Sequence, residues 1–218
     1  MIIVLFGPPG VGKGTQSAKL SAHLGIPAFS TGDMFRHAIA NETPLGKKIK
    51  ATMEAGDLVG DDVVNELVAD RMSQPDCKDG LILDGYPRTV AQVKVLDSWL
   101  AGHKFKLDHV IELVVDREEL VQRLQGRLYA PTSKRTYHEM YAPPKVAGIC
   151  DESGEALIHR DDDKPDVVRH RFDVYTKNTQ PVLDHFAKDG RLKEIDGLQS
   201  IDKVYGDILK VLGASKSV

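Results

Sequence analysis

The sequence has little of several features that mark the more specialised classes of protein. Its 218 residues include only two cysteines, Cys77 and Cys150, too few for a disulfide framework or a four-cysteine zinc site. It also has no excess of positive charge, because 29 basic and 32 acidic side chains give a formal net charge of −3. Binding to nucleic acid or to an anionic membrane is therefore not expected. Any phosphate-bearing partners are expected to be small molecules.

Long hydrophobic runs are also missing. The apolar start, residues 1–6, runs into Gly7-Pro8-Pro9-Gly10, so it is too short for a signal sequence and lacks the basic residues of one. A membrane-spanning helix needs about 20 predominantly apolar residues, and no segment approaches that length. Together with the few cysteines, this predicts a cytoplasmic protein, with a mitochondrial or other organellar location as the alternative.

Short apolar runs alternate with helical patterns along most of the chain. A composition of 41% hydrophobic and 28% charged residues suits one globular unit with insertions. Alternating strands and helices build a parallel sheet with helices on its faces, so the predicted fold class is α/β, doubly wound. The five predicted strands are 2–6, 28–29, 81–83, 110–115 and 192–195.

Polar residues and glycines predict several helix boundaries. A helix from Gly14 should end at Gly25, because glycine commonly terminates helices. Asp61 or Asp62 is expected to cap the helix that follows it. Asp116 and the Glu119 three residues later predict a capping box for a further helix.

Two segments do not follow the strand–helix alternation. Residues 30–59 offer two short helices, one of them after Thr43-Pro44 and ending at Gly56, with no strand between them. Residues 127–164 are rich in proline and glycine and show little helical period, and a loop of that length in a compact domain is usually functional or disordered. We interpret both as insertions into one core.

The first predicted strand leads into a phosphate-binding motif. Gly7 and the Gly12-Lys13 pair have the spacing Gly-x4-Gly-Lys, which occurs by chance in roughly one such chain in eight. Its position between a strand and a helix makes it specific, because glycines and a helix N-terminus can direct backbone N–H groups at phosphate. One departure stands out: Gly14 occupies the place of the usual Mg²⁺-binding hydroxyl, which comes one residue later, at Thr15.

Beyond this motif, the sequence resembles the long-lid adenylate kinases, a branch of the nucleoside-monophosphate kinases. The resemblance covers nearly the whole chain, and chance does not explain so many separate matches. It is carried by residues 7–15, 30–36, 84–89, Gln92, Arg123, 126–127, 135–138, 143–146, 160–163 and Arg171.

The resemblance implies a complete domain plan. It implies a P-loop NTPase-type core with a five-stranded parallel sheet, strand order 2-3-1-4-5, flanked by helices. It also implies a cis bond before Pro87 and a monomeric protein. The implied parts are a core of 1–29, 60–126 and 165–218, an AMP-binding insert at 30–59 and a lid at 127–164.

The resemblance also implies the site residues. Lys13 would hold the donor's β- and γ-phosphates, Arg123 would stack on the donor base, and Gln92 would read the acceptor's adenine edge. The implied ATP-binding residues are Gly10, Val11, Gly12, Lys13, Gly14, Thr15, Arg123 and Arg127. The implied AMP-binding residues are Thr31, Arg36, Gly85, Arg88, Gln92, Arg160 and Arg171. The implied catalytic residues are Lys13, Arg88, Arg127, Arg160, Arg171 and Asp84.

Phosphoryl transfer needs positive charge and positioning more than proton transfer. Because the acceptor is already an ionised phosphate, no histidine is given a catalytic role. Mg²⁺ is expected to arrive with ATP, with Asp84 orienting its bound water rather than binding the metal directly. No structural zinc is expected, since the family's zinc positions hold Ala130, Ser133, Cys150 and Ser153.

These residues predict reversible transfer from MgATP to AMP, giving two ADP. Two alternatives stay open: a GTP:AMP phosphotransferase, because base stacking encodes donor identity weakly, and a catalytically silent nucleotide-binding regulator. The long lid disfavours a UMP/CMP kinase, and Gly14 disfavours a P-loop GTPase.

Overall fold

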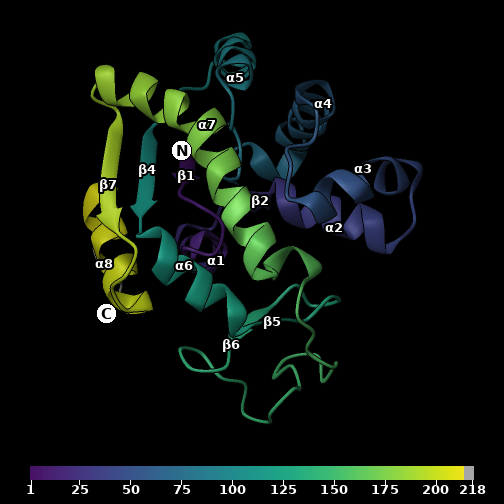
Figure 1. Cartoon of the computed structure of the whole chain (residues 1–218). Helices are drawn as coiled ribbons and strands as arrows, with labels where there is room; N and C mark the ends of the chain where they lie inside the picture. Colours follow the sequence, from purple (N-terminus) through teal and green to yellow (C-terminus); the bar gives the residue numbers. More distant parts are fainter. Residues whose placement is uncertain (214–218) are drawn as a thin grey trace.

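A five-stranded parallel sheet with helices on both faces forms the body of the molecule (Figure 1). The computed structural model describes residues 1–213, so residues 214–218 of the predicted core lie outside the described part. The strand order β2-β3-β1-β4-β7 confirms the expected 2-3-1-4-5 arrangement, since β7 is the fifth strand of this sheet. The strands are β1 (Ile2–Phe6), β2 (Ala28–Ser30), β3 (Leu81–Asp84), β4 (His109–Val114) and β7 (Leu192–Asp196).

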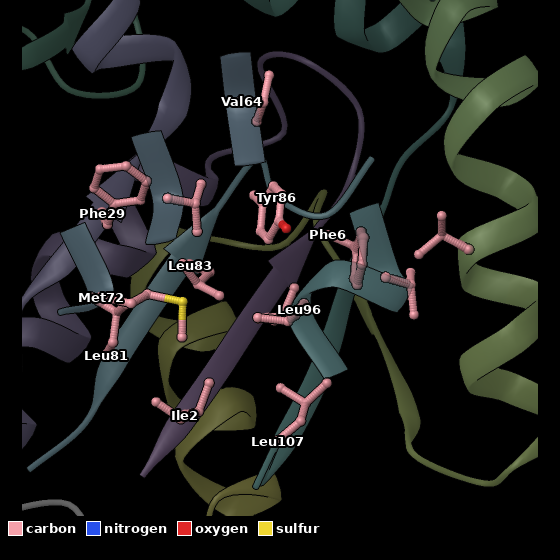
Figure 2. Packing of buried hydrophobic residues seen from close by; sticks show 14 of the residues in the cluster. Ile2, Phe6, Phe29, Val64, Met72, Leu81, Leu83, Tyr86, Leu96 and Leu107 are labelled. Carbon is pink, nitrogen blue, oxygen red and sulfur yellow. The ribbon is translucent and has the colours of Figure 1, made fainter. Parts of the chain in front are cut away.

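The apolar run of β1 is buried on both faces of the sheet. Ile2, Val4 and Phe6 belong to one apolar cluster, whereas Ile3 and Leu5 belong to a second. This alternation follows from the two-residue period of a strand, and it explains why β1 shows no polar alternation in sequence. Figure 2 shows part of the first cluster around β1 and β3.

Helices contribute buried residues to both clusters. Helices α4 and α5 contribute to the first cluster, α1, α6 and α8 contribute to the second, and α7 contributes to both; Phe35 and Ile49, from two helices described below, also belong to the first. Within the described residues 1–213, no helix is long and apolar enough to cross a membrane. The bounds are α1 (Lys13–Leu24), α4 (Asp61–Met72), α5 (Val90–Gly102), α6 (Arg117–Gln125), α7 (Pro165–Lys188) and α8 (Ile201–Val211).

Helix boundaries followed the sequence signals only in part. Gly25 ends α1 in the left-handed region, as predicted. The prediction that Asp61 or Asp62 caps α4 was wrong. The cap position is Gly60, and no side chain caps the first turn of the helix by a hydrogen bond. Asp116 does cap α6, but it accepts the N–H of Glu118 rather than the third-position N–H of a capping box.

The segment 30–59, called here the first insert, contains two helices as predicted, although Ser30 still belongs to β2. The helices are α2 (Thr31–Ala40) and α3 (Pro44–Ala55). The hydroxyl of Thr43 accepts the N–H of Gly46, and Gly56 ends α3 with a φ of 85°. The cap and the helix stop are therefore local properties of the sequence.

The segment 127–164, called here the lid segment, contains strands that the sequence did not predict. β5 (Arg127–Tyr129) pairs antiparallel with β6 (Thr136–His138), and isolated bridges such as Tyr129 with Ile158 extend the pairing. Strands of three residues are too short to show a hydrophobic period, which explains the difference. A 3-10 turn, η2 (Asp161–Asp163), leads into α7, and another, η1 (Pro75–Cys77), precedes β3.

Candidate active site

The loop between β1 and α1 is shaped by its glycines. Gly7, Gly10 and Gly12 have φ values of 139°, 88° and 107°, which other residues rarely adopt. A Cβ on Gly7 would lie 2.6 Å from the Leu113 carbonyl oxygen, and one on Gly10 would overlap Leu124. The loop can therefore follow this path only with glycine, and it places the N-terminus of α1 at a cavity.

This cavity has a volume of about 720 Å³ and brings together every predicted site residue. The residues come from segments far apart in the chain: the glycine loop, the first insert, the loop after β3, the α6 end, the lid segment and α7. Those that line it are Gly10, Val11, Gly12, Lys13, Gly14, Thr15, Thr31, Arg36, Asp84, Gly85, Arg88, Gln92, Arg123, Arg127, Arg160 and Arg171.

Lys13 and Asp84 occupy the core side of the cavity. The Lys13 ammonium donates to the carbonyl oxygens of Gly7 at 2.7 Å and Pro8 at 3.0 Å. Desolvation lowers the pKa of Lys13 to about 8, although the charge of Asp84 partly opposes this. Burial in turn raises the pKa of Asp84, and the Lys13 charge opposes that rise. The two groups therefore stabilise each other's ionised form.

Asp84 is the last residue of β3, and the loop after it turns sharply. Gly85 has a φ of 82°, and the Tyr86–Pro87 bond is cis, as the resemblance implied. The turn returns the Arg88 side chain toward the loop, where its Nε donates to the Gly85 carbonyl oxygen at 2.9 Å. Desolvation lowers the pKa of Arg88, as expected for a cation set inside the protein.

Carboxylates hold the remaining guanidinium groups in place. Arg36 donates to Asp33 at 2.7 Å and lies 3.6 Å from Asp162, which also lies 2.9 Å from Arg171. Arg160 lies 3.7 Å from Asp33. Because Arg36 and Asp33 belong to the first insert, these pairs connect that insert to the end of the lid segment.

Crowding of cations is evident at the lid side. Arg127 forms a two-pronged ion pair with Asp163, and the guanidinium carbon of Arg160 lies over the Tyr129 ring, 3.8 Å from its centre. Desolvation, and then the charges of Arg36 and Arg127, lower the pKa of Arg160. Such a cluster favours a polyanionic ligand, because phosphate oxygens would relieve the repulsion.

One end of the cavity is built around Arg123. Its guanidinium donates to the carbonyl oxygens of Gly197 and Leu198, both at 2.9 Å, which leaves its plane as a flat surface. The centre of the Tyr141 ring lies 5.6 Å from the guanidinium carbon of Arg123, and His138 contacts the Arg123 carbonyl oxygen at 2.8 Å. Arg123 and Tyr141 both line the cavity, so this end offers planar groups on which an aromatic ring can stack.

Sequence reasoning gave no role to His138, Tyr141 or the loop 197–200, all of which line the cavity. His138 lies inside one of the matching segments, and Tyr141 follows three residues later. Their closeness to a segment that matches the family could have marked both residues as candidates for the site. Nothing in the sequence around 197–200 marks it as part of a site, because it contributes through backbone position.

The other end of the cavity surrounds Gln92, which is 2% exposed. Thr31 donates its hydroxyl to the Gly85 carbonyl oxygen at 3.1 Å, and apolar side chains complete the walls. The apolar lining residues there are Phe35, Met53, Leu58, Val59 and Val64. The cavity therefore has a cationic centre between two less charged ends, an arrangement that fits two nucleotides joined at their phosphates.

Comparison with known proteins agrees with this geometry. The sequence model of the family described as adenylate kinase matches residues 5–191. The chain belongs to the adenylate kinase family. It is 47% identical over 217 residues to the adenylate kinase of Shouchella clausii, covering 100% of each chain. It is 46% identical over 217 residues to that of Archaeoglobus fulgidus, again covering 100% of each. The adenylate kinase of Chloroherpeton thalassium is 49% identical over 213 residues, covering 97% of this chain and 98% of the relative.

Some adenylate kinases bind zinc at the positions that correspond to Ala130, Ser133, Cys150 and Ser153. Here a cluster of hydrogen-bonded side chains surrounds these positions. The Cys150 sulfur lies 3.3 Å from the Ser133 hydroxyl and 3.4 Å from the Tyr137 hydroxyl. Glu155 accepts the N–H groups of Thr132 and Ser133, both at 2.8 Å. In the described part of the chain, no three His, Cys, Asp or Glu residues are grouped so that they could hold a metal ion.

Proposed function

We propose that this protein catalyses the reversible transfer of a phosphoryl group from MgATP to AMP, giving two ADP. The observation that carries the proposal is the convergence of Lys13 and five cavity arginines from distant segments on one cavity. Those arginines are Arg36, Arg88, Arg127, Arg160 and Arg171. A loose phosphoryl transition state spreads negative charge over its equatorial oxygens, which such a ring of cations stabilises.

The donor subsite is proposed at the glycine loop. Backbone N–H groups from Gly10 to Thr15 and the Lys13 ammonium would hold the β- and γ-phosphates of ATP. Arg123 would stack on the adenine, and Arg127 would reach the transferring group. On binding ATP, Lys13 would exchange its contacts with two carbonyl oxygens for contacts with phosphate oxygens.

The acceptor subsite is proposed between the first insert and the loop after β3. Arg36 and Arg88 would grip the AMP phosphate, with Arg160 and Arg171 approaching from the lid side. Thr31, Gly85 and Gln92 would contact the base. An ionised phosphate oxygen attacks without losing a proton, so this arrangement needs no general base, and positioning supplies the catalysis.

We propose that residues 30–59 act as an AMP-binding insert, 127–164 as a lid, and 1–29, 60–126 and 165–218 as the core. The pairs Arg36–Asp162 and Arg160–Asp33 support this, because they bring the two insertions together across the cavity. Closing a lid over the phosphates excludes water and prevents loss of the donor by hydrolysis.

Mg²⁺ fits the residues at this site. Asp84 is a buried carboxylate at a strand end, and its raised pKa reports incomplete compensation by neighbouring cations. Gly14 offers no hydroxyl, so we propose that Asp84 orients water bound to the metal rather than binding it directly. When bound with ATP, Mg²⁺ would offset the charge of the β- and γ-phosphates.

We further propose that the protein works as a cytoplasmic monomer. Every predicted site residue lines the cavity of this single chain, so no further residue from a partner subunit is needed to complete the proposed site. Cys77 and Cys150 are buried and form no disulfide, which suits a reducing compartment.

The proposal is tested by incubating the protein with Mg²⁺, ATP and AMP and measuring nucleotides by chromatography. The expected result is two ADP formed for each AMP consumed, with the reverse reaction from ADP alone. Replacing ATP by GTP, and AMP by CMP or UMP, should lower kcat/KM. No ADP from the wild-type protein would contradict the proposal, and a higher kcat/KM with GTP would reassign the donor.

A further inference from the structure

The side-chain amide of Gln92 is held by two partners of opposite hydrogen-bonding character. Its Oε1 accepts the backbone N–H of Arg88 at 2.7 Å, and its Nε2 donates to Asp61 Oδ1, also at 2.7 Å. A backbone N–H can only donate, and an ionised carboxylate can only accept. Rotating the amide by 180° would therefore break both hydrogen bonds and place like groups against each other.

Asp61 is itself fixed in place. Its second oxygen, Oδ2, accepts the hydroxyl of Thr89 at 2.9 Å, so both carboxylate oxygens have partners. The Thr89 hydroxyl also accepts the backbone N–H of Gln92 at 3.2 Å as the cap of α5. This explains why Asp61 does not cap its own helix: its carboxylate is directed toward α5 instead.

The backbone of Gln92 is anchored as well. The Tyr86 hydroxyl contacts the Gln92 carbonyl oxygen at 3.2 Å and Asn65 Oδ1 at 2.8 Å. Gln92 is therefore held at its backbone and at both ends of its amide, while still lining the cavity. The amide keeps one N–H and one acceptor lone pair for a ligand. Asp61 and Arg88 determine where the donor and the acceptor of this amide lie.

A fixed amide distinguishes purines by the edge that carries position 6. Adenine presents a 6-amino donor beside the N1 acceptor, which matches the free acceptor and free N–H of the amide. Hypoxanthine presents an O6 acceptor beside an N1–H donor, so an acceptor would face an acceptor and a donor would face a donor. Only a flipped amide would suit hypoxanthine, and unpaired buried polar groups are strongly disfavoured.

We infer that Asp61 is a positioning residue that selects 6-aminopurine nucleotides as acceptors by fixing the orientation of Gln92. This inference rests on the proposed function, because it takes the Gln92 end of the cavity as the acceptor-base subsite. AMP and IMP carry the same ribose and phosphate and differ only at this edge. Their ratio of kcat/KM therefore isolates the reading of the base from phosphate binding.

The experiment compares AMP with IMP as acceptors for wild type, Asp61→Asn and a control, Asp62→Asn. Asparagine keeps the shape of Asp61 but can donate as well as accept, so it removes one of the two contacts that oppose the flipped amide, while the Arg88 N–H remains. The AMP/IMP ratio should fall about tenfold in Asp61→Asn, through KM more than kcat. The ratio should stay unchanged in Asp62→Asn, which removes an exposed carboxylate one residue away. Where IMP turnover is too slow to measure, its inhibition constant against AMP replaces kcat/KM.

Thermal unfolding of each variant checks folding, and Thr89→Val provides a second route. That variant removes the hydroxyl bonded to Asp61 Oδ2 and should lower the ratio in the same direction by a smaller factor. If Asp61→Asn does not fold, the ratio in Thr89→Val decides. A ratio within twofold of wild type in the folded variants, or an equal fall in Asp62→Asn, would overturn the inference. No ADP from the wild type with AMP would instead refute the proposed function.

Discussion

The sheet and the lid segment keep their shapes by different means. Every strand of the five-stranded sheet contributes buried side chains to the two apolar clusters, and no residue of 127–164 belongs to either among the described residues. The lid segment depends on a short hairpin, isolated bridges and side-chain hydrogen bonds around Cys150 and Glu155. Several of its apolar side chains are exposed, including Met140 and Val146.

The two kinds of contact contribute different amounts to the free energy of unfolding. Burying a large apolar side chain contributes about 1.5–3 kcal/mol, whereas a hydrogen bond contributes a net 1 kcal/mol or so. The sheet therefore sets the positions of Lys13 and Asp84 firmly. The lid segment brings Arg127 and Arg160 to the same cavity through contacts that break at a small free-energy cost, which is consistent with the lid role proposed for it above.

The sharpest test of this comparison removes the charge supplied by the core. Lys13→Met should lower kcat/KM by about 10⁴-fold or more, because the β- and γ-phosphates lose a full charge at the transition state. The apolar clusters do not include Lys13, so the free energy of unfolding should change little. A coupled assay for ADP measures the effect.

The matched control for that variant is Lys19→Met, on the same helix. Lys19 does not line the cavity, although its exposed partner Asp202 does, and replacing Lys19 should leave kcat/KM near the wild-type value. Comparable losses in both variants would show that α1, rather than the Lys13 charge, had been disturbed.

The next test changes the charge supplied by the lid side. Arg160→Lys keeps one positive charge but loses the planar group that lies on Tyr129, so kcat/KM should fall by about 10²- to 10³-fold. Arg169→Lys, on α7 and outside the cavity lining, changes a side chain that is 43% exposed; it serves as the control and should show almost no change. An Arg160→Lys enzyme as active as wild type would mean that this position needs only a positive charge and not the planar guanidinium group.

The structural half of the comparison is tested by truncating one apolar side chain in each region. Leu83 in β3 is 0% exposed, and Leu83→Ala should lower the free energy of unfolding by about 2–5 kcal/mol. Ile158 in the lid segment is 47% exposed, and Ile158→Ala should lower it by about 0.5 kcal/mol or less. Urea denaturation followed by circular dichroism measures both, and equal losses would contradict the comparison.

The smallest predicted effect is on pH dependence. Since the pKa of Lys13 is lowered to about 8, the nucleotide-free protein loses this charge as the pH rises through that value. The kcat/KM for ATP should therefore fall above pH 8, approaching about tenfold per pH unit. Bound phosphates favour the charged amine, so the decline in kcat should begin at higher pH. Rates measured from pH 6 to 10 check this, and a flat kcat/KM would contradict it.

Much of the fold was accessible from local patterns. The centres of all five main strands, the glycine loop and both helices of the first insert were predicted, because each is encoded by neighbouring residues. The strands of the lid segment were missed, since three-residue strands show no period. The cap of α4 was assigned wrongly because the carboxylate of Asp61 is taken by Thr89 and Gln92, more than twenty residues away.

The site divides in the same way. The types of its residues were readable from motifs, whereas the partners of those residues were not. Nothing near Arg36 in the sequence indicates that Asp162 lies 3.6 Å from it, and the contribution of His138 and Tyr141 at the Arg123 end was not predicted.

By itself, the order of amino acids determined which stretches become strands and helices, and that a phosphate-binding loop follows the first strand. These features depend on period, on permitted backbone angles and on bonds between near neighbours. Only the folded chain decided that six distant cations meet at one cavity and that an aspartate holds a glutamine amide in one orientation. Such contacts depend on the path of the whole backbone, because electrostatic and hydrogen-bond energies are set by distance in space and not by separation along the chain.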